Sequence, residues 1–360
     1  MKDKTLLLTD VNFWIKGAGH RMRIADMISY LSAHLSLTVV YIGVMDSLLQ
    51  GDLSKEYGVE LVILDDKKII STVAYGQRLR RYLKNNTFKA VIIEYIHNSV
   101  FLNYLRREQV VILDIHDIIS ERSKEFEKFN YRGTMFELDQ YTEVEILNAY
   151  DRVIVLCKPD LIKLQALTDP GRVMLCPHPA IPSFHPTRKL ALNVNFLGSE
   201  YLPNKDAIQN FVINCWPQVA PGRPVTLNIY GNVCKVIDFE IPPQVVLKYY
   251  AHNIESIYNQ ADIIINPVRF GAGLKIKNIE ALANGRPLIT TRHGARGLEP
   301  GAGNAFLVAE DMTHFTELLL QLIDSYELRL KLSATALEFV TARFSQEACL
   351  TPLLNYIAAL

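Results

Sequence analysis

The chain has 360 residues, enough for two α/β domains of ordinary size. Hydrophobic residues make up 49% of it, which excludes a largely disordered protein. The 38 basic side chains balance 38 acidic ones, and this formal net charge of zero argues against nucleic acid as the main partner.

The cysteines and the apolar runs indicate the compartment. The five cysteines are scattered, odd in number and without C-x-x-C spacing, which predicts reduced and packed thiols. The apolar run at 6–8 is too short for a signal peptide. No apolar stretch reaches the roughly 18 residues that a membrane span needs. We therefore expect a cytoplasmic protein.

Short apolar runs alternate with helical patterns in the first half of the chain. Strands are predicted at 5–9, 37–42, 59–64, 90–94, 110–113, 152–156 and 173–176. Helices are predicted between them, at 21–34, 72–84, 100–107, 135–149 and 160–167. This rhythm predicts a doubly wound parallel sheet, with ligands beyond the carboxyl ends of its strands.

A glycine-containing loop follows the first predicted strand. Gly17 and Gly19 allow close backbone approach, and Arg21 opens a helix, where an anion is favoured. We predict that these three residues bind substrate. A dinucleotide fingerprint would need a third glycine where Met22 stands, so a nicotinamide cofactor is not expected. A plain turn with solvated arginines is the alternative.

The helix predicted at 72–84 carries four basic residues, Arg78, Arg80, Arg81 and Lys84. Such a charge run is usually a solvated face. Enzymes that act on lipid-linked acceptors often rest a helix of this kind on an anionic membrane. Peripheral contact with the inner face of the membrane is therefore left open.

Polar residues cluster where the strand predicted at 110–113 ends. Asp114, His116 and Asp117 follow it directly. A histidine beside carboxylates can donate a hydrogen bond to a sugar oxygen, or become imidazolium and stabilise a departing anion. We predict a catalytic role for His116, with a helix-capping role as the alternative. Arg122 follows within one turn and could serve the same site.

A proline-rich segment at 176–186 predicts a domain boundary. We expect a first domain at 1–180, a second at 181–344 and a final helix at 345–360. The second domain is predicted to contain strands at 194–198, 225–230, 263–265 and 305–308. Its predicted helices run from about 205 through Trp216 and then at 253–260, 274–284 and 312–324.

The segment 262–291 carries the strongest functional pattern. A short apolar strand is followed by Gly271 and Gly273, and then by a helix with Lys275 and Lys277 in its first turn. Cations are unfavourable at a helix N-terminus unless an anion binds there. Glu280 lies one turn deeper on the same face, where a ribose diol could donate to it. A solvated lysine–glutamate pair is the alternative.

This segment resembles the nucleotide-sugar site of GT-B glycosyltransferases, especially family 4, often called group 1. Members carry a G-x-G loop with two basic residues and then a helix that ends in E-A-x-A-x-G-x-P-V-I. The matching residues here are Gly271, Gly273, Lys275, Lys277, Glu280, Ala281, Ala283, Gly285, Pro287 and Ile289. The resemblance implies that both lysines hold the donor diphosphate and that Glu280 holds the ribose. Ala272 stands where many members have a second glutamate.

The start of the second domain extends the resemblance. The group 1 pattern F-L-G-S-x-x-x-P-N is matched at Phe196, Gly198, Ser199, Pro203 and Asn204. Lys205 follows and could reach a phosphate. Asn204, Lys205, Gly231 and Arg269 are therefore assigned to substrate binding together with the glycine loop.

The resemblance implies two Rossmann-like domains that face a cleft, with the first on the acceptor side and the final helix crossing back to it. It implies retaining transfer of a sugar from a nucleotide-diphosphate sugar to a glycan, lipid-linked or other sugar acceptor, as in polysaccharide biosynthesis. The sequence has no Asp-x-Asp for a bridging metal; the nearest pattern is Asp238-Phe-Glu240. We therefore expect neither a metal nor a cofactor.

Two other functions remain open at this point. A nucleotide-sugar 2-epimerase shares the fold and would need acid/base carboxylates, for which Asp114 and Asp117 are the candidates. A binding protein could keep the fold without turnover, given Ala272 in place of the usual glutamate.

Overall fold

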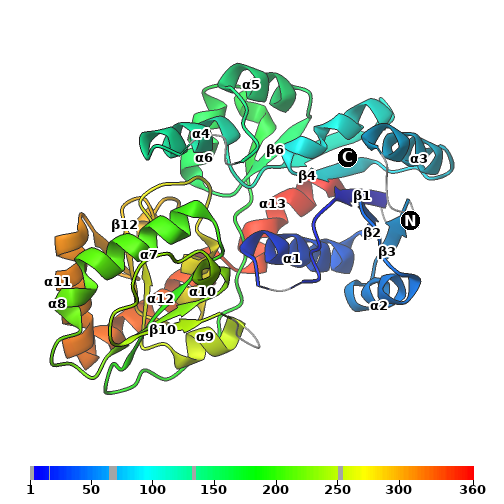
Figure 1. Cartoon of the computed structure of the whole chain (residues 1–360). Helices are drawn as coiled ribbons and strands as arrows, with labels where there is room; N and C mark the ends of the chain where they lie inside the picture. Colours follow the sequence, from blue (N-terminus) through cyan, green and yellow to red (C-terminus); the bar gives the residue numbers. More distant parts are fainter. Residues whose placement is uncertain (1–3, 16, 65–70, 132–134, 250–253) are drawn as a thin grey trace. The chain divides into compact units, whose positions relative to one another are not determined.

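The computed structural model describes residues 4–15, 17–64, 71–131, 135–249 and 254–360, which divide into two compact units (Figure 1). The first unit comprises Met1–Ser123, Gly133–Pro179 and Cys349–Leu360. The second unit comprises Lys124–Arg132 and Ala180–Ala348. Each unit has its own parallel sheet.

The first unit contains a parallel sheet in the order β3-β2-β1-β4-β5-β6-β7. Its strands are β1 (Lys4–Thr9), β2 (Ser36–Tyr41), β3 (Glu60–Ile63), β4 (Ala90–Glu94), β5 (Val110–Asp114), β6 (Arg152–Val155) and β7 (Val173–Leu175). The order reverses between β1 and β4. In doubly wound sheets, ligands bind beyond the strand ends at such a reversal.

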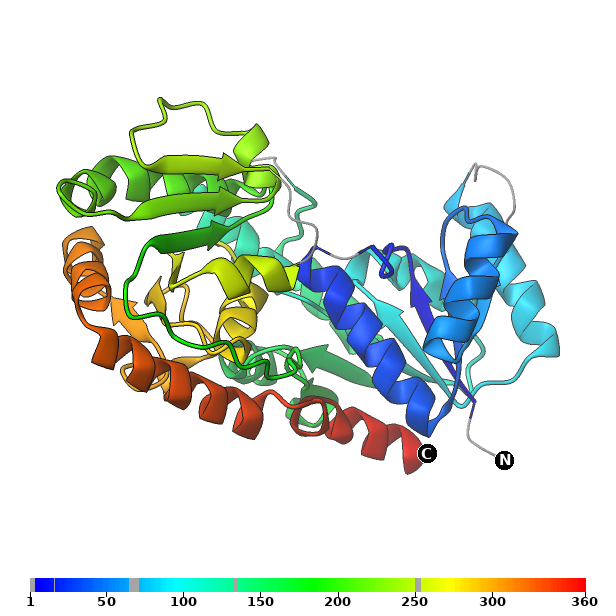
Figure 2. The ribbon, with the colours of Figure 1, turned by 90° about the horizontal axis from the view of Figure 1, so that it is seen from below.

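Helices cover both faces of this sheet (Figures 1 and 2). They are α1 (Gly19–His34), α2 (Ser47–Tyr57), α3 (Thr72–Asn85), η1 (Ile96–Tyr104), α4 (Ile119–Lys128, in this unit up to Ser123), α5 (Gln140–Asn148), α6 (Lys158–Gln165), η2 (Pro170–Arg172) and α13 (Gln346–Ala358, in this unit from Cys349). The strands are nearly continuous runs of buried aliphatic residues, as two covered faces require. The core on one face gathers Leu8, Val91, Leu113 and Val153 with Leu79 of α3.

The second unit repeats the arrangement with a sheet in the order β10-β9-β8-β11-β12-β13. Its strands are β8 (Asn193–Leu197), β9 (Thr226–Tyr230), β10 (Val245–Lys248), β11 (Ile263–Asn266), β12 (Leu288–Thr291) and β13 (Leu307–Ala309). Its helices are α7 (Leu202–Asn214), α8 (Trp216–Val219), η3 (Asn232–Lys235), α9 (Ile254–Gln260), α10 (Ile276–Ala283), η4 (Glu299–Gly301), α11 (Met312–Asp324) and α12 (Tyr326–Arg343). Here the order reverses between β8 and β11.

The predicted α/β class with two doubly wound domains is confirmed, and most predicted elements lie within two residues of the observed ones. The helix predicted at 100–107 is wrong, because that region is the 3-10 helix η1 (Ile96–Tyr104). The helix predicted at 135–149 begins only at Gln140. Helix α12 was not predicted, because its buried face mixes apolar with polar residues such as Arg329 and Ser333.

The unit boundary at Pro179 and Ala180 lies next to the predicted one at 180 and 181. Two segments belong to a different unit from the residues that precede them in the sequence. Residues 124–132 are part of the second unit, whereas the last twelve residues, from Cys349, are part of the first. A cleft between the units stays a prediction.

The C-terminal segment is tied to the first unit by side chains of α13. The Tyr30 hydroxyl of α1 bonds the Thr351 hydroxyl at 2.9 Å, and Arg152 lies over the Tyr356 ring. All five cysteines are reduced and buried. Within the described residues, no helix combines the length and apolarity needed to cross a membrane.

Candidate functional site

The predicted glycine loop lies in the second unit at the point where the strand order reverses. After β11, Gly271 and Gly273 adopt φ values of 108° and 69°, which favour glycine over any residue with a side chain. Helix α10 then begins at Ile276, with Lys275 at its N-cap. The helix is shorter than the predicted 274–284, and its Ile276 and Asn278 N–H groups donate to the carbonyls of Leu274 and Lys275.

Lys277 is held at the junction of three elements. Its Nζ donates to the Asn204 Oδ1 of α7 at 2.7 Å and to the Leu197 carbonyl of β8 at 2.9 Å. The ammonium also lies 4.6 Å from the centre of the Phe196 ring. Burial lowers the pKa of Lys277 to about 7, and the charge of Lys275 adds to the shift. An anion at this site would draw the lysine back to its charged form.

Lys275 forms hydrogen bonds to the glycine loop itself. Its Nζ donates to the carbonyls of Ala272 at 3.1 Å and Gly273 at 2.9 Å. The two predicted lysines therefore lie on the same loop–helix junction, one bonded to the loop and one to the strand β8. The two cations and the helix N-terminus together favour a negatively charged ligand.

Glu280 lies buried one turn further along α10. Its Oε2 accepts from the Tyr258 hydroxyl of α9 at 2.7 Å. Burial raises the pKa of Glu280, and the Tyr258 hydrogen bond and Lys277 oppose that rise. Tyr258 was missed by sequence reasoning, since nothing in its local pattern distinguishes it from an ordinary core aromatic.

A buried amide network fixes the position of α10. Asn266, the last residue of β11, donates to the Asn278 Oδ1 at 2.7 Å, and Asn278 donates to the Gly294 carbonyl at 2.9 Å. Both side chains are fully buried. Sequence reasoning missed this pair, although an asparagine within an apolar strand end was a usable signal.

The remaining predicted residues of the second unit divide into two groups. Asn204 accepts from Lys277, so it belongs to the lysine site. Gly231 has a φ of 94°, and a Cβ there would lie 2.4 Å from the Gly198 carbonyl, beside the same strand end. Lys205 instead pairs with Asp238 at 2.6 Å, and Arg269 pairs with Asp206 at 2.6 Å.

An aromatic cluster packs against Phe270, the residue that precedes the glycine loop of the second unit. Phe270, fully buried, stacks on Phe129 at 4.4 Å and on Tyr131 at 5.4 Å, and Phe126 meets it edge-on at 5.3 Å. These contacts explain why residues 124–132 belong to the second unit. They also fix the residue that precedes Gly271.

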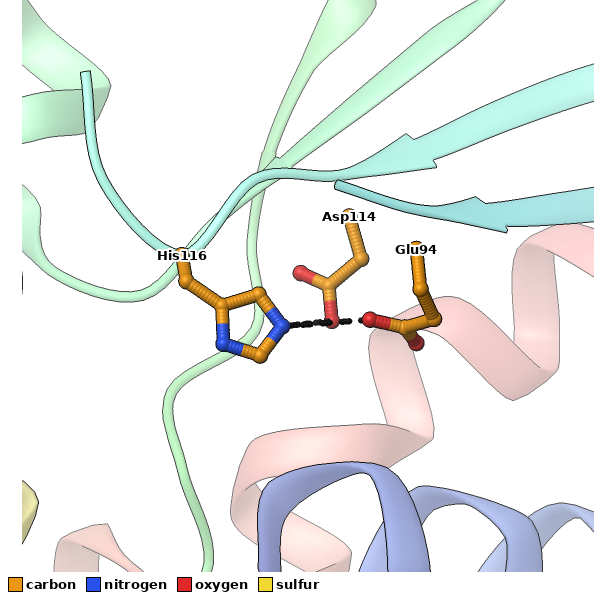
Figure 3. A group of neighbouring side chains, drawn as sticks. All are labelled: Glu94, Asp114 and His116. Atoms are coloured by element: carbon orange, nitrogen blue, oxygen red, sulfur yellow. Dashed lines mark hydrogen bonds and ion pairs between the residues drawn. The ribbon is translucent and has the colours of Figure 1, made fainter. Parts of the chain in front are cut away.

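In the first unit, His116 lies with two carboxyl groups at the ends of β4 and β5 (Figure 3). Its Nε2 is 3.1 Å from the Glu94 Oε2 and 3.9 Å from the Asp114 Oδ2. The imidazole also stacks on the Tyr95 ring, with the ring centres 4.1 Å apart. Both carboxyl side chains are fully buried, whereas the imidazole is 9% exposed.

Arg23 supplies the positive charge of this cluster. Its Nε and Nη2 donate to both oxygens of Asp114 at 2.8 and 3.0 Å, and Nη1 donates to the Pro177 carbonyl. Arg23 is fully buried, so the alternative of solvated arginines is wrong for this residue. Glu94, Asp114 and His116 are close enough to ligate a metal, but the Arg23 guanidinium already neutralises the group and disfavours a second cation.

The glycine loop of the first unit lies at the start of α1. Gly17 has a φ of 109°, Gly19 is the first residue of the helix, and Arg21 is half-buried in its first turn. The Arg21 Nε is buried and has no hydrogen-bond partner among the described residues. The three residues predicted here thus lie at or just before the start of α1. The Arg21 Nε can donate a hydrogen bond to a ligand at this position.

The two carboxylates considered for acid/base chemistry are both ion-paired. Asp114 is bonded by Arg23, and the Asp117 Oδ2 accepts from Arg122 at 2.9 Å. Burial raises the pKa of Asp114, and the charge and hydrogen bonds of Arg23 oppose that rise. In both residues a guanidinium occupies the carboxylate oxygens that acid/base chemistry would need.

Comparison with known proteins identifies the second unit. Residues 191–325 match the family described as Glycosyl transferases group 1. Residues 191–325 therefore form a group 1 glycosyltransferase domain. The matched region contains the loop, both lysines and Glu280, so the family pattern and the buried site coincide in the glycosyltransferase.

Solved structures resemble the whole glycosyltransferase. TarM of S. aureus superimposes with a TM-score of 0.77 at 12% identity, covering 99% of each chain. The Anabaena protein Alr3699/HepE, solved with UDP and glucose, gives a TM-score of 0.73 at 12% identity, covering 99% of this chain and 100% of that one. At these identities the likeness establishes the fold, which is GT-B.

One curated relative is similar in sequence. The "Uncharacterized 44.6 kDa protein in cps region" of Klebsiella pneumoniae is 24% identical over 267 residues. The alignment spans 67% of the glycosyltransferase and 66% of that relative.

Proposed function

We propose that the glycosyltransferase moves a sugar from a nucleotide-diphosphate sugar to a glycan or lipid-linked acceptor, with retention and without a metal ion. The observation that carries this proposal is Lys277, a half-buried ammonium beside the N-terminus of α10 and at the end of β8. Its pKa is lowered, and its Nζ donates to two neutral oxygens, an arrangement that suits an anion.

The donor diphosphate fits this site by charge. Lys275 and Lys277 provide two ammonium groups, and the α10 N-terminus provides the positive end of the helix dipole. Such preorganised positive charge stabilises a departing diphosphate without a bridging cation. Glu280, one turn deeper, accepts from the ribose hydroxyls, and Tyr258 fixes the carboxylate in place.

His116 acts on the transferred sugar. It lies at the strand-order reversal of the first unit, where ligands of doubly wound sheets bind. The imidazole donates a hydrogen bond to a sugar oxygen and so orients the donor for transfer. Because Ala272 stands in place of a glutamate, this contact contributes a larger share of the binding of the sugar.

The acceptor is assigned to a hollow in the first unit. The hollow has a volume of about 480 Å³ and is lined by Asp10, Ile42, Gly43, Val44, Thr72, Tyr75 and Phe101. One carboxylate on an otherwise largely apolar wall suits a sugar, whose hydroxyls and C–H faces need both. The S. aureus TarM structure with fondaparinux and α-GlcNAc-glycerol, and the Klebsiella relative in a cps region, support a glycan acceptor and a role in polysaccharide biosynthesis.

A panel of nucleotide sugars tests this function. We expect slow hydrolysis of one donor without acceptor, and faster turnover when a sugar acceptor is added. An epimerised donor would favour the 2-epimerase, although the ion pairs of Asp114 and Asp117 disfavour it. Thermal stabilisation by a donor, with no turnover under any condition, would favour a binding protein.

The basic residues of α3 leave membrane contact as a prediction. Arg80 donates to the Asn103 carbonyl at 2.8 Å and lies over the Tyr104 ring, so it is engaged within the first unit. Arg81 and Lys84 are exposed on the same helix. A cytoplasmic location with peripheral attachment stays a proposal.

A further inference from the structure

Glu94 is a buried acid with an unusual set of contacts. It ends β4, its side chain is fully buried, and its Oε2 lies 3.1 Å from the His116 Nε2. Its Oε1 has no hydrogen-bond partner among the described residues. An ionised carboxylate with one oxygen unpaired in such a site is costly, whereas a neutral carboxylic acid leaves only a carbonyl oxygen unpaired.

Tyr95, the next residue, is held in a strained conformation that serves the same histidine. Its φ is 67°, a region that bulky residues rarely occupy. Strain of this kind costs about 1–3 kcal/mol and is concentrated at functional sites. It turns the phenol ring flat against His116, with the planes 19° apart, and the ring also stacks on His97.

The ring nitrogens of His116 face different surroundings. Figure 3 shows one nitrogen turned toward the two carboxyl groups and the other turned away from them. Within the part of the chain that the structure describes, Nδ1 has no hydrogen-bond partner. The protonation state of Glu94 therefore decides whether the His116 Nδ1 is a hydrogen-bond donor or an acceptor.

We propose that Glu94 is a positioning residue, which as a neutral acid donates its proton to the His116 Nε2 and so keeps a hydrogen on Nδ1. The role rests on the function proposed above, in which His116 donates a hydrogen bond to the donor sugar. A neutral imidazole has one N–H, so a donor on Nε2 forces the hydrogen to Nδ1. Were Glu94 ionised, Nε2 would carry the hydrogen and Nδ1 would become an acceptor.

The charges around the pair agree with this assignment. Burial raises the pKa of Glu94 to about 8, against the opposing charge of Arg23. Burial also lowers the pKa of His116 to about 4, although Asp114 opposes that shift. At neutral pH both partners are then uncharged. The titratable or charged groups that act on the pair are Asp10, His20, Arg23, Tyr95, Asp114, Asp117 and His178.

The pH dependence has a definite sign. Below about pH 8 Glu94 is protonated and Nδ1 carries a hydrogen; above it Glu94 ionises and Nδ1 loses its donor role. Turnover should therefore fall as the pH rises through about 8. Glu94→Gln places an amide N–H where the acid O–H was. The turnover of this variant at neutral pH should therefore match that of the wild type, and it should not fall as the pH rises through about 8.

Two readouts test the proposal. The ¹⁵N shifts of the His116 ring, assigned by comparison with His116→Ala, should show Nδ1–H in the wild type and in Glu94→Gln. Glu94→Leu should change the tautomer and reduce kcat by about tenfold, the loss of roughly one hydrogen bond. Asp169→Asn is the matched control, because it also replaces a carboxylate of the first unit by an amide, at an exposed position. Its turnover should still fall at alkaline pH, as in the wild type.

An Nε2–H tautomer in the wild type at neutral pH would overturn the role of Glu94. So would an alkaline fall that persists in Glu94→Gln. The tautomer is measured without substrate, which separates the two proposals. The expected tautomers with equal turnover in every variant would instead overturn the role of His116 in transfer.

Discussion

At the scale of single residues, the donor site depends on charges that the fold has removed from water. Among the described residues, Lys277 donates to a carbonyl and an amide oxygen, and Glu280 accepts from a tyrosine hydroxyl. Burial disfavours the charged form of both side chains, and their attraction for each other offsets only part of that cost. Binding of a diphosphate relieves this cost, so both residues should contribute more to affinity than surface groups do.

Lys277→Met keeps an unbranched side chain of similar length but removes the ammonium that lies over the Phe196 ring. We expect binding of a nucleoside diphosphate to weaken by about tenfold or more, because a charged hydrogen bond contributes roughly 1.5–3 kcal/mol. Titration calorimetry measures the affinity. Arg292→Ala, at an exposed arginine of the same unit, is the matched control and should leave the affinity unchanged.

The calorimetry also reports on protonation. Since burial lowers the pKa of Lys277 to about 7, the empty site is partly neutral there, and an anion raises that pKa again. Wild-type binding should then take up protons and weaken above pH 7, an effect absent from Lys277→Met. Equal affinity in the variant and the wild type would contradict the assignment of this lysine.

Glu280→Gln keeps the shape of the side chain and loses the charge that strengthens hydrogen bonds to hydroxyls. We expect weaker binding of every nucleotide, with or without an attached sugar, because the ribose is common to all. Competition against a fluorescent nucleotide measures this, with Glu310→Gln on the surface as the control. A loss that depends on the sugar would place Glu280 on the sugar instead.

At the scale of elements, both sites depend on tight turns at the ends of parallel strands. Gly231 follows β9 with φ 94° and ψ −172°, a region essentially restricted to glycine. It packs against the Gly198 carbonyl, next to the Leu197 carbonyl that binds Lys277. The backbone of β8 can therefore hold the lysine only while this approach is kept.

Gly231→Ala should lower the free energy of unfolding by more than the about 1–3 kcal/mol that strained dihedrals alone cost. The added Cβ would lie 2.4 Å from a backbone oxygen, so β8 or the turn must shift. Gly222→Ala is the matched control, because it has a φ of 72° but open space around it, and should cost about 1–2 kcal/mol. Urea unfolding compares the two, and equal losses would show that the close approach is relaxed in solution.

At the scale of the whole molecule, the proposed chemistry is divided between the two units. The lysines and Glu280 belong to the second unit, whereas His116 and Glu94 belong to the first. In the proposed transfer, both sets act on one donor in the reacting state. Contacts made only in that state should appear in turnover more than in binding.

His116→Ala should reduce the transfer rate by about a hundredfold or more, in the range of positioned acid/base groups. Affinity for the bare nucleoside diphosphate should hardly change, because that ligand is held by the second unit. Initial rates together with calorimetry make the comparison. His34→Ala, at an exposed histidine of α1, is the control, and a wild-type rate in His116→Ala would leave His116 a packing residue.

The sequence by itself determined the fold class and the segment that we propose binds the donor. Parallel strands of an α/β sheet are continuous apolar runs, and glycines and prolines mark their ends, so local pattern was sufficient for strands such as β4 and for helix α11. The glycine loop with Lys275 and Lys277 was visible for the same reason, since all its parts lie within a few residues.

Only the tertiary structure decided which partners these residues have. Glu94 and His116 are 22 residues apart in sequence, and Arg23 and Asp114 are 91 apart. A parallel sheet brings strand ends together over such separations, and no local period records which ends meet. Lys205 and Arg269 show the converse: their residue type suggested phosphate ligands, but carboxylates from distant segments pair with them. Charge is a property of the residue, whereas its availability is set by the neighbours that folding supplies.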